Sequence, residues 1–136
     1  MIVAEQKPIE EIRQYLAGHK RTLLIGCGGC VTVCLAGGER EVATLAGILR
    51  LAGNGDTEII EQTIERQCDA EFFDTVKQPA QNCDAILSMA CGVGVQMAAR
   101  IFADKPVYPA LNTMFCGTND TAGQWSENCL ACGDCK

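Results

Sequence analysis

The chain has 136 residues and a formal net charge of −6, with 48 % hydrophobic and 21 % charged residues. This length suits one domain with its own core, and this composition excludes an intrinsically disordered chain. Acidic residues outnumber basic residues by 17 to 11, and aromatic residues make up only 5 %. We therefore expect no nucleic-acid partner, because phosphate binding needs clustered basic side chains and base stacking needs aromatic ones.

Helical and extended patterns alternate along the first half of the chain. Residues 8–18 have apolar side chains at helical spacing, and residues 22–26 (TLLIG) form a short apolar run typical of a buried strand. Helical periodicity returns over residues 39–52, and Gly53-Asn54-Gly55 is expected to end that helix. Residues 57–64 are the next predicted strand.

The same alternation continues in the second half. A helix is predicted over residues 70–78, and Pro79 is expected to end it because proline lacks a backbone N–H. Residues 85–89 (AILSM) read as a strand and residues 93–102 as a helix. Residues 106–111 (PVYPAL) are predicted to be an edge strand, because a proline cannot donate to a neighbouring strand.

Strands separated by helices predict a parallel sheet with right-handed crossovers. We therefore predict the α/β class, with a small Rossmann- or flavodoxin-like sheet of about four strands, over residues 1–111. Residues 112–136 are polar, rich in glycine and cysteine, and contain the only tryptophan. This segment is predicted to be an irregular tail that a metal holds in place.

Ten cysteines are the most informative feature of the composition. The N-terminal residues lack the apolar segment of a secretory signal, and no run reaches the ~20 apolar residues that a membrane span needs. We expect a cytoplasmic chain with no membrane segment, in which thiols stay reduced. Clustered cysteines there indicate metal ligands or redox centres rather than structural disulfides.

The first cysteine group is Cys27, Cys30 and Cys34, directly after the first predicted strand. Two thiolates separated by two residues can bind one metal, and Cys34 would follow Cys30 by one helical turn. Gly28 and Gly29 leave room for backbone N–H groups to approach the sulfides of a cluster. The same Cys-x2-Cys could instead be the redox pair of a thiol oxidoreductase, although a dithiol couple needs no third cysteine.

The fourth ligand of this group has to come from elsewhere in the fold. In open parallel sheets, ligands bind at the carboxyl ends of the strands. Cys91 follows the third predicted strand directly and is the first candidate, with Gly92 leaving space beside it; Cys116 and Cys68 are the alternatives. Cys83 precedes that strand, so we expect an ordinary buried thiol at the opposite edge.

The second group is Cys129, Cys132 and Cys135. Its spacing matches the first three ligands of the bacterial ferredoxin run, which predicts a [4Fe–4S] cluster, and zinc is the alternative. The fourth ligand would be Cys116, Cys68, a cysteine of another chain, or a residue of a longer C-terminus.

Four segments in combination resemble a known family: GCGGCVTVCLAGGEREV (26–42), ERQCD (65–69), LSMACGVGVQ (87–96) and CLACGDC (129–135). They are similar to the small cysteine-rich subunit of methylenetetrahydrofolate reductase of acetogens and related anaerobes, and the resemblance covers nearly the whole chain. It implies a subunit with iron–sulfur clusters, and zinc as a further metal. The partner would be a TIM-barrel catalytic subunit that holds the flavin, FMN, and the folate site.

The resemblance also implies metal-ligand roles at particular cysteines. Members of the family continue past CLACGDC with further cysteines, which leaves the composition of the tail site open. The implied ligands are Cys27, Cys30, Cys34, Cys91, Cys129, Cys132 and Cys135, with Cys68 and Cys116 as additional candidates.

Two main functions follow as hypotheses. The chain is either an electron-transfer subunit that relays electrons to the partner's flavin, or a docking adaptor, stabilised by zinc or a cluster, that binds a ferredoxin or another electron-donor complex. The single histidine and the scattered acids predict no acid–base catalysis by the chain itself. A thiol oxidoreductase is the third hypothesis.

Overall fold

A parallel sheet forms the centre of the protein. The computed structural model describes residues 1–53 and 57–135. Its larger sheet has four parallel strands in the order β3-β2-β4-β5, which confirms the predicted α/β class and the Rossmann- or flavodoxin-like sheet. The strands are β2 (Arg21–Cys27), β3 (Glu58–Ile64), β4 (Ala85–Met89) and β5 (Val107–Pro109).

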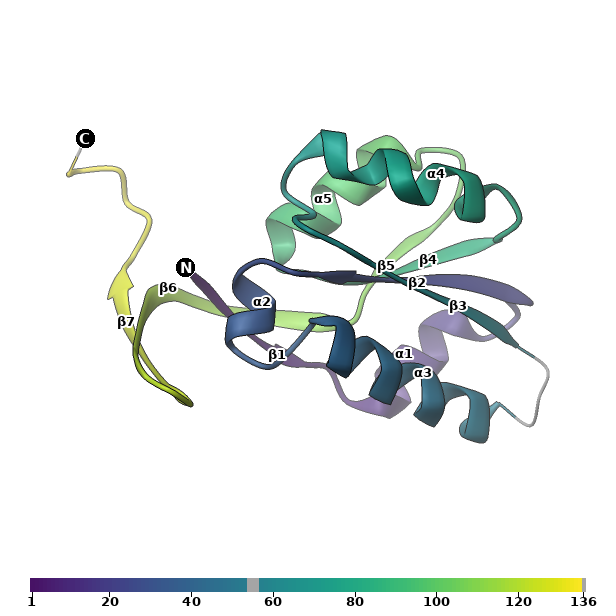
Figure 1. Ribbon diagram of the computed structural model, residues 1–136, viewed down its shortest axis with the longest axis horizontal. Coiled ribbons are helices and arrows are strands. Elements are labelled where there is room, and N and C mark those ends of the chain that lie inside the picture. Colours follow the sequence, from purple (N-terminus) through teal and green to yellow (C-terminus); the bar gives the residue numbers. More distant parts are fainter. Residues whose placement is uncertain (54–56, 136) are drawn as a thin grey trace.

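Helices cover both faces of this sheet, α4 and α5 on one side and α1 and α3 on the other (Figure 1). The side chains of β2 alternate between the two faces of the sheet and are buried on both, because helices cover both faces. Leu23 and Ile25 pack with α4 and α5, whereas Leu24 packs with α1 and α3. The helices are α1 (Ile9–Leu16), α2 (Cys30–Val33), α3 (Glu39–Ala52), α4 (Asp74–Gln81) and α5 (Gly92–Ile101), with a short 3₁₀ turn, η1 (Ala70–Phe73).

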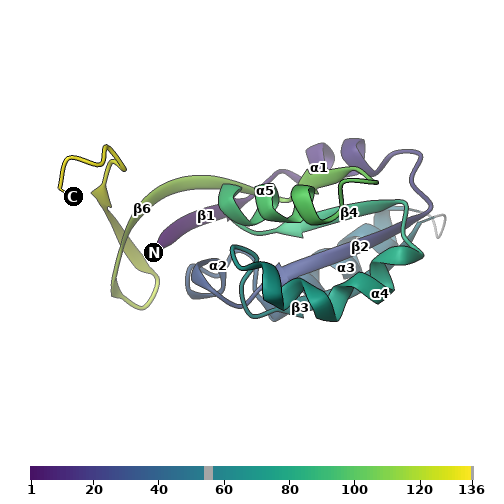
Figure 2. The same ribbon diagram turned by 90° about the horizontal axis from the view of Figure 1, so that it is seen from above.

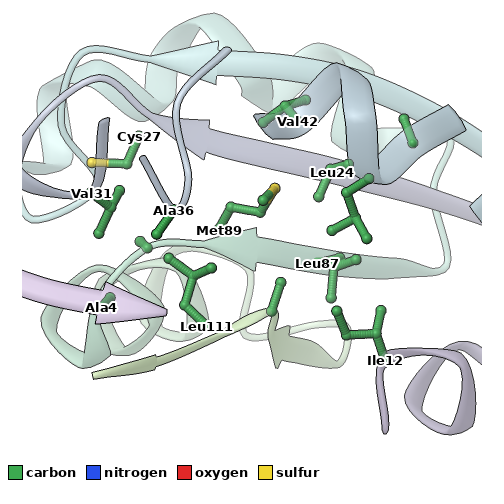
Figure 3. Packing of buried hydrophobic residues seen from close by; sticks show 14 of the residues in the cluster. Ala4, Ile12, Leu24, Cys27, Val31, Ala36, Val42, Leu87, Met89 and Leu111 are labelled. Atoms are coloured by element: carbon green, nitrogen blue, oxygen red, sulfur yellow. The ribbon is translucent and has the colours of Figure 1, made fainter. Parts of the chain in front are cut away.

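Burial of apolar side chains holds these layers together. In the cluster on the α1/α3 side, Ile12 and Val42 lie against Leu24 and Leu87 (Figure 3). Each fully buried leucine or isoleucine contributes about 1.5–3 kcal/mol to stability. Cys27 lies in the same cluster, next to Val31, so the first cysteine group begins inside the core.

Most predicted elements occur close to their expected bounds, and helix 39–52 and strand 85–89 match exactly. Helix α3 ends at Ala52 with Gly53 as its C-cap, as predicted. Asn54 and Gly55, the other two residues of the predicted helix end, lie outside the described residues. The prediction that Pro79 ends a helix is wrong, since α4 continues to Gln81 with Pro79 inside it. Burial of Val76 and Ala80 on either side of the proline stabilises that helix through packing, which outweighs the lost hydrogen bond.

A second, antiparallel sheet is the main difference from the expected structure. Its three strands, in the order β1-β6-β7, are β1 (Ile2–Gln6), β6 (Leu111–Thr121) and β7 (Gln124–Cys129). The sequence did not predict β1, and the expectation of an irregular segment is wrong for residues 112–129. Polar residues dominate β6 and β7, and β6 pairs with a strand at the far end of the sequence. Neither feature gives a local pattern that a sequence analysis can detect.

The β6–β7 hairpin lies at one end of the molecule and extends away from the helical layers (Figures 1 and 2). Residues 130–135 follow β7 without regular structure. Within the described ranges, none of the helices has both the length and the hydropathy that crossing a membrane requires.

Candidate metal centre

Three cysteines follow three neighbouring strands at one edge of the parallel sheet. Cys27 is the last residue of β2, Cys68 lies four residues beyond the end of β3, and Cys91 lies two residues beyond β4. Because the strands are parallel, these ends meet at the same edge. The loop after β3 closes over Cys27, since the backbone N–H of Gln67 donates to the Cys27 Sγ at 3.5 Å.

The environment of Cys27 raises the pKa of its thiol. Burial is the largest cause, because it disfavours the charged thiolate, and negative charge on Cys68 or Cys91 raises the pKa further. The backbone N–H groups of Gln67 and Gly29 act in the opposite direction. Cys27 is therefore a protonated thiol at neutral pH unless a nearby cation stabilises its thiolate.

The glycines of this edge allow the backbone to pack closely. The Gly28 N–H donates to the Ile64 carbonyl at 2.8 Å, and a Cβ at Gly28 would lie 3.2 Å from the Glu65 carbonyl oxygen. A Cβ at Gly29 would lie 3.6 Å from the Cys27 Sγ, which is an ordinary contact. The absence of a side chain at Gly28 thus allows the loop after β2 to pack closely against the loop after β3.

Cys91 and Gly92 lie at the start of α5. Cys91 is the N-cap residue of this ten-residue helix and is half-buried. The N–H of Gly92 donates to the Thr113 Oγ1 at 2.9 Å, so it binds β6 in this structure.

Cys30 and Cys34 have different surroundings, although the sequence places them in one group with Cys27. Cys30 is the first residue of α2 and is half-buried. Cys34 is buried, accepts the N–H of Ala4 at 3.5 Å and directs its own S–H at the carbonyls of Ala4 and Val31. The Cys34 thiol thus connects α2 to β1, a strand that the sequence did not predict.

A buried polar network supports the edge and was missed by the sequence analysis. Gln67 is fully buried; its Nε2 donates to the Ile25 carbonyl at 2.7 Å, and its Oε1 accepts the Ser88 hydroxyl at 2.6 Å. The Gln67 side chain thus joins β2 and β4, while its backbone N–H binds the Cys27 sulfur. A glutamine directly before Cys68 was the only sequence signal.

Replacing Gln67 with leucine should lower the free energy of unfolding by about 2–3 kcal/mol, because it leaves the Ser88 hydroxyl buried without this partner and removes the hydrogen bond to the Ile25 carbonyl. Urea denaturation of the purified protein measures this loss. In the Gln67→Leu/Ser88→Ala double variant, part of the loss should be recovered, since one unpaired group is gone. Strictly additive effects would contradict the network.

The remaining cysteines lie elsewhere. Cys83 is buried before β4 and donates to the Pro79 carbonyl at 3.4 Å, which confirms the expected buried thiol, and burial raises its pKa. Cys116 in β6 lies directly opposite Cys129 in β7. Cys132 and Cys135 are exposed in the segment after β7.

The structure therefore brings together cysteines that are distant in sequence without closing a complete site. Within residues 1–53 and 57–135, no three Cys, His, Asp or Glu side chains are arranged so that they could hold a metal ion as they stand. The thiols at the sheet edge have the donor chemistry of zinc and iron–sulfur sites. This chain matches no protein-family model, no curated protein and no solved structure.

Proposed function

We propose that this chain is an iron–sulfur electron-transfer subunit that passes electrons to the flavin of a partner enzyme of the methylenetetrahydrofolate reductase type. The observation that carries the proposal is the placement of Cys27, Cys68 and Cys91 after three adjacent strands, at one edge of the sheet. The resemblance of the cysteine motifs to the small reductase subunit suggests the partner.

The donor set fits an iron–sulfur cluster in its chemistry. Cys27, Cys68 and Cys91 supply three thiols, and Cys30 lies three residues after Cys27 at the start of α2. In this proposal Cys30 is the fourth ligand, because the Cys34 thiol is hydrogen-bonded to the backbone of β1. A [4Fe–4S] cluster bound there would supply one-electron transfer.

The protein's own groups would set the properties of such a site. The Gln67 N–H donates to the Cys27 sulfur and so stabilises negative charge on it. Burial of Cys27 keeps water from that side of the proposed site. Hydrogen bonds to sulfur and solvent exposure are two of the factors that set a cluster's potential.

Three exposed apolar side chains, Val33, Leu35 and Val93, follow proposed ligands in the chain and suit contact with a partner. Val33 and Leu35 follow Cys30 in the chain, Val93 follows Cys91, and all three side chains are exposed. Leu35 is also held in the left-handed region, with φ 58°, which is strained for a leucine. Exposed apolar side chains at a site edge are typical of an interaction surface.

The alternative of a thiol oxidoreductase fits these observations less well. In such enzymes the attacking cysteine of the Cys-x2-Cys pair has a lowered pKa. Burial instead raises the pKa of Cys27, and its sulfur accepts a backbone N–H beneath the loop after β3.

Anaerobic purification tests the proposal. We expect iron and acid-labile sulfide, an EPR signal after reduction with dithionite, and reduction of added FMN by the reduced protein. The Cys91→Ser variant should have less iron and a weaker EPR signal than the wild type. The matched Cys83→Ser variant should have the iron content and the EPR signal of the wild type. Zinc alone, with no reducible signal, would overturn the proposal in favour of the docking adaptor.

A further inference from the structure

The hairpin end holds a second set of cysteines, separate from the sheet edge. Cys116 in β6 and Cys129 in β7 are paired residues of the antiparallel ladder. Directly opposed residues have their side chains on the same face, with Cβ atoms roughly 4.5–5.5 Å apart. Two thiols from positions thirteen residues apart in sequence are thus neighbours because of the strand register.

The backbone after Cys129 turns in a way that suits a thiolate ligand. The N–H of Ala131 donates to the Cys129 Sγ at 3.4 Å. Ala131 and Gly133 both have left-handed backbone conformations, with φ of 54° and 79°. This conformation is costly for alanine, so the turn at Ala131 is a strained feature of the kind found at ligand sites.

The turn keeps the last two cysteines within reach of the pair. Cys132 and Cys135 follow at intervals of three residues, and three residues span at most roughly 10 Å. Both are exposed, as are the residues between them, so folding this segment over Cys129 buries little and displaces no core side chain. A metal would therefore gather four thiolates, two of which the strand register has already brought together.

The outer hairpin also needs stabilisation from another source. Strand β1 pairs with β6 as far as Cys116, and Met1 exchanges two backbone hydrogen bonds with Gly117. The residues beyond Gly117 form a two-stranded ribbon with an almost fully exposed β7. Isolated two-stranded hairpins are marginally stable in water. A four-thiolate metal site at the base of this ribbon would hold its two strands and the terminal segment together.

We propose that Cys116, Cys129, Cys132 and Cys135 form a four-thiolate metal site, with Cys116 as the ligand that completes the Cys-x2-Cys-x2-Cys run. Zinc and a [4Fe–4S] cluster share this ligand chemistry. The site does not depend on the proposed electron-transfer function, because it shares no cysteine with the sheet edge.

Metal and sulfide analysis of the full chain, purified anaerobically, tests this site. Cys116→Ser and Cys132→Ser should each lose the same metal relative to the wild type: one zinc, or the iron and sulfide of one cluster. The matched Cys83→Ser variant should lose nothing. Cys91→Ser should lose the metal of the sheet edge instead, so its loss and that of Cys132→Ser should add in the double variant. Loss with Cys132→Ser but not with Cys116→Ser would overturn the role of Cys116, and loss with neither would overturn the site.

A second variant removes the geometry while keeping every cysteine. A Cβ at Gly117 would overlap the carbonyl oxygen of Ser126, so Gly117→Ala should force β6 and β7 apart and release the tail metal. Retention of that metal in Gly117→Ala would contradict the proposed dependence on strand pairing. For zinc, X-ray absorption should show four sulfur neighbours at about 2.3 Å, and nitrogen or oxygen ligands in place of sulfur would exclude the four-thiolate set.

Discussion

Replacing Gly37 with alanine should lower the free energy of unfolding by about 3 kcal/mol or more. A Cβ at this position would overlap the carbonyl oxygen of Met89 and lie 3.0 Å from the Val31 Cγ2. The Gly37 carbonyl also accepts the N–H of Cys27 at 2.9 Å, so the loop cannot move aside without breaking the end of β2. The Gly37→Ala substitution should therefore disturb both the core and the proposed site.

The matched control is Gly47→Ala, in the interior of α3. Apart from the chain neighbours and the backbone of the same helix, no atom lies within 4 Å of a Cβ at that position, so the change should stabilise the protein by about 0.5–1 kcal/mol through helix propensity. Urea denaturation of both variants measures the contrast. Equal stability of the two variants would contradict the close approach of Gly37 to β4.

The second large effect separates Cys30 from Cys34. Under the proposed function, Cys30→Ser should remove the iron of the proposed sheet-edge cluster and lower the melting temperature, because metal binding is coupled to folding. Cys34→Ser should keep that iron and lose only local stability, since the Cys34 thiol contacts Ala4 and Val31. Iron analysis and thermal unfolding of the two variants measure the difference.

The wild-type chain and Cys83→Ser provide the reference values for that comparison. If Cys34→Ser loses as much iron as Cys30→Ser, then Cys34 is a ligand, and the contact with β1 must open when the metal binds. Unchanged iron in Cys30→Ser would remove Cys30 from the proposed ligand set.

The parallel sheet could be predicted because its signals are local. Apolar runs such as residues 22–26 and 85–89 and the helical periodicity of residues 39–52 need no information from distant residues. The placement of Cys27 and Cys91 at one edge then follows from the topology alone, since parallel strands end at the same side.

The antiparallel sheet could not be predicted in this way. Strand β1 depends on pairing with β6, for instance Ile2 with Cys116, across almost the whole chain. Missing that strand had a direct consequence at the site, because the partner of the Cys34 thiol is Ala4 in β1. Spacing alone groups Cys34 with Cys27 and Cys30, whereas in the structure its thiol contacts Ala4 and Val31, and its predicted role as a ligand stays a prediction.

The role of Gln67 could also not be predicted from the sequence. A glutamine between an exposed loop and a cysteine motif has no local pattern that indicates burial. Its position follows only from the loop after β3 folding across the ends of β2 and β4, where Ile25 and Ser88 supply the partners.

Anomalous scattering from crystals of anaerobically purified protein tests the central claim most directly. The proposed site predicts a strong peak at the iron absorption edge, bordered by the sulfur atoms of Cys27, Cys68 and Cys91. Anomalous density there at the zinc edge alone, or no anomalous density beside these three sulfurs, would contradict it.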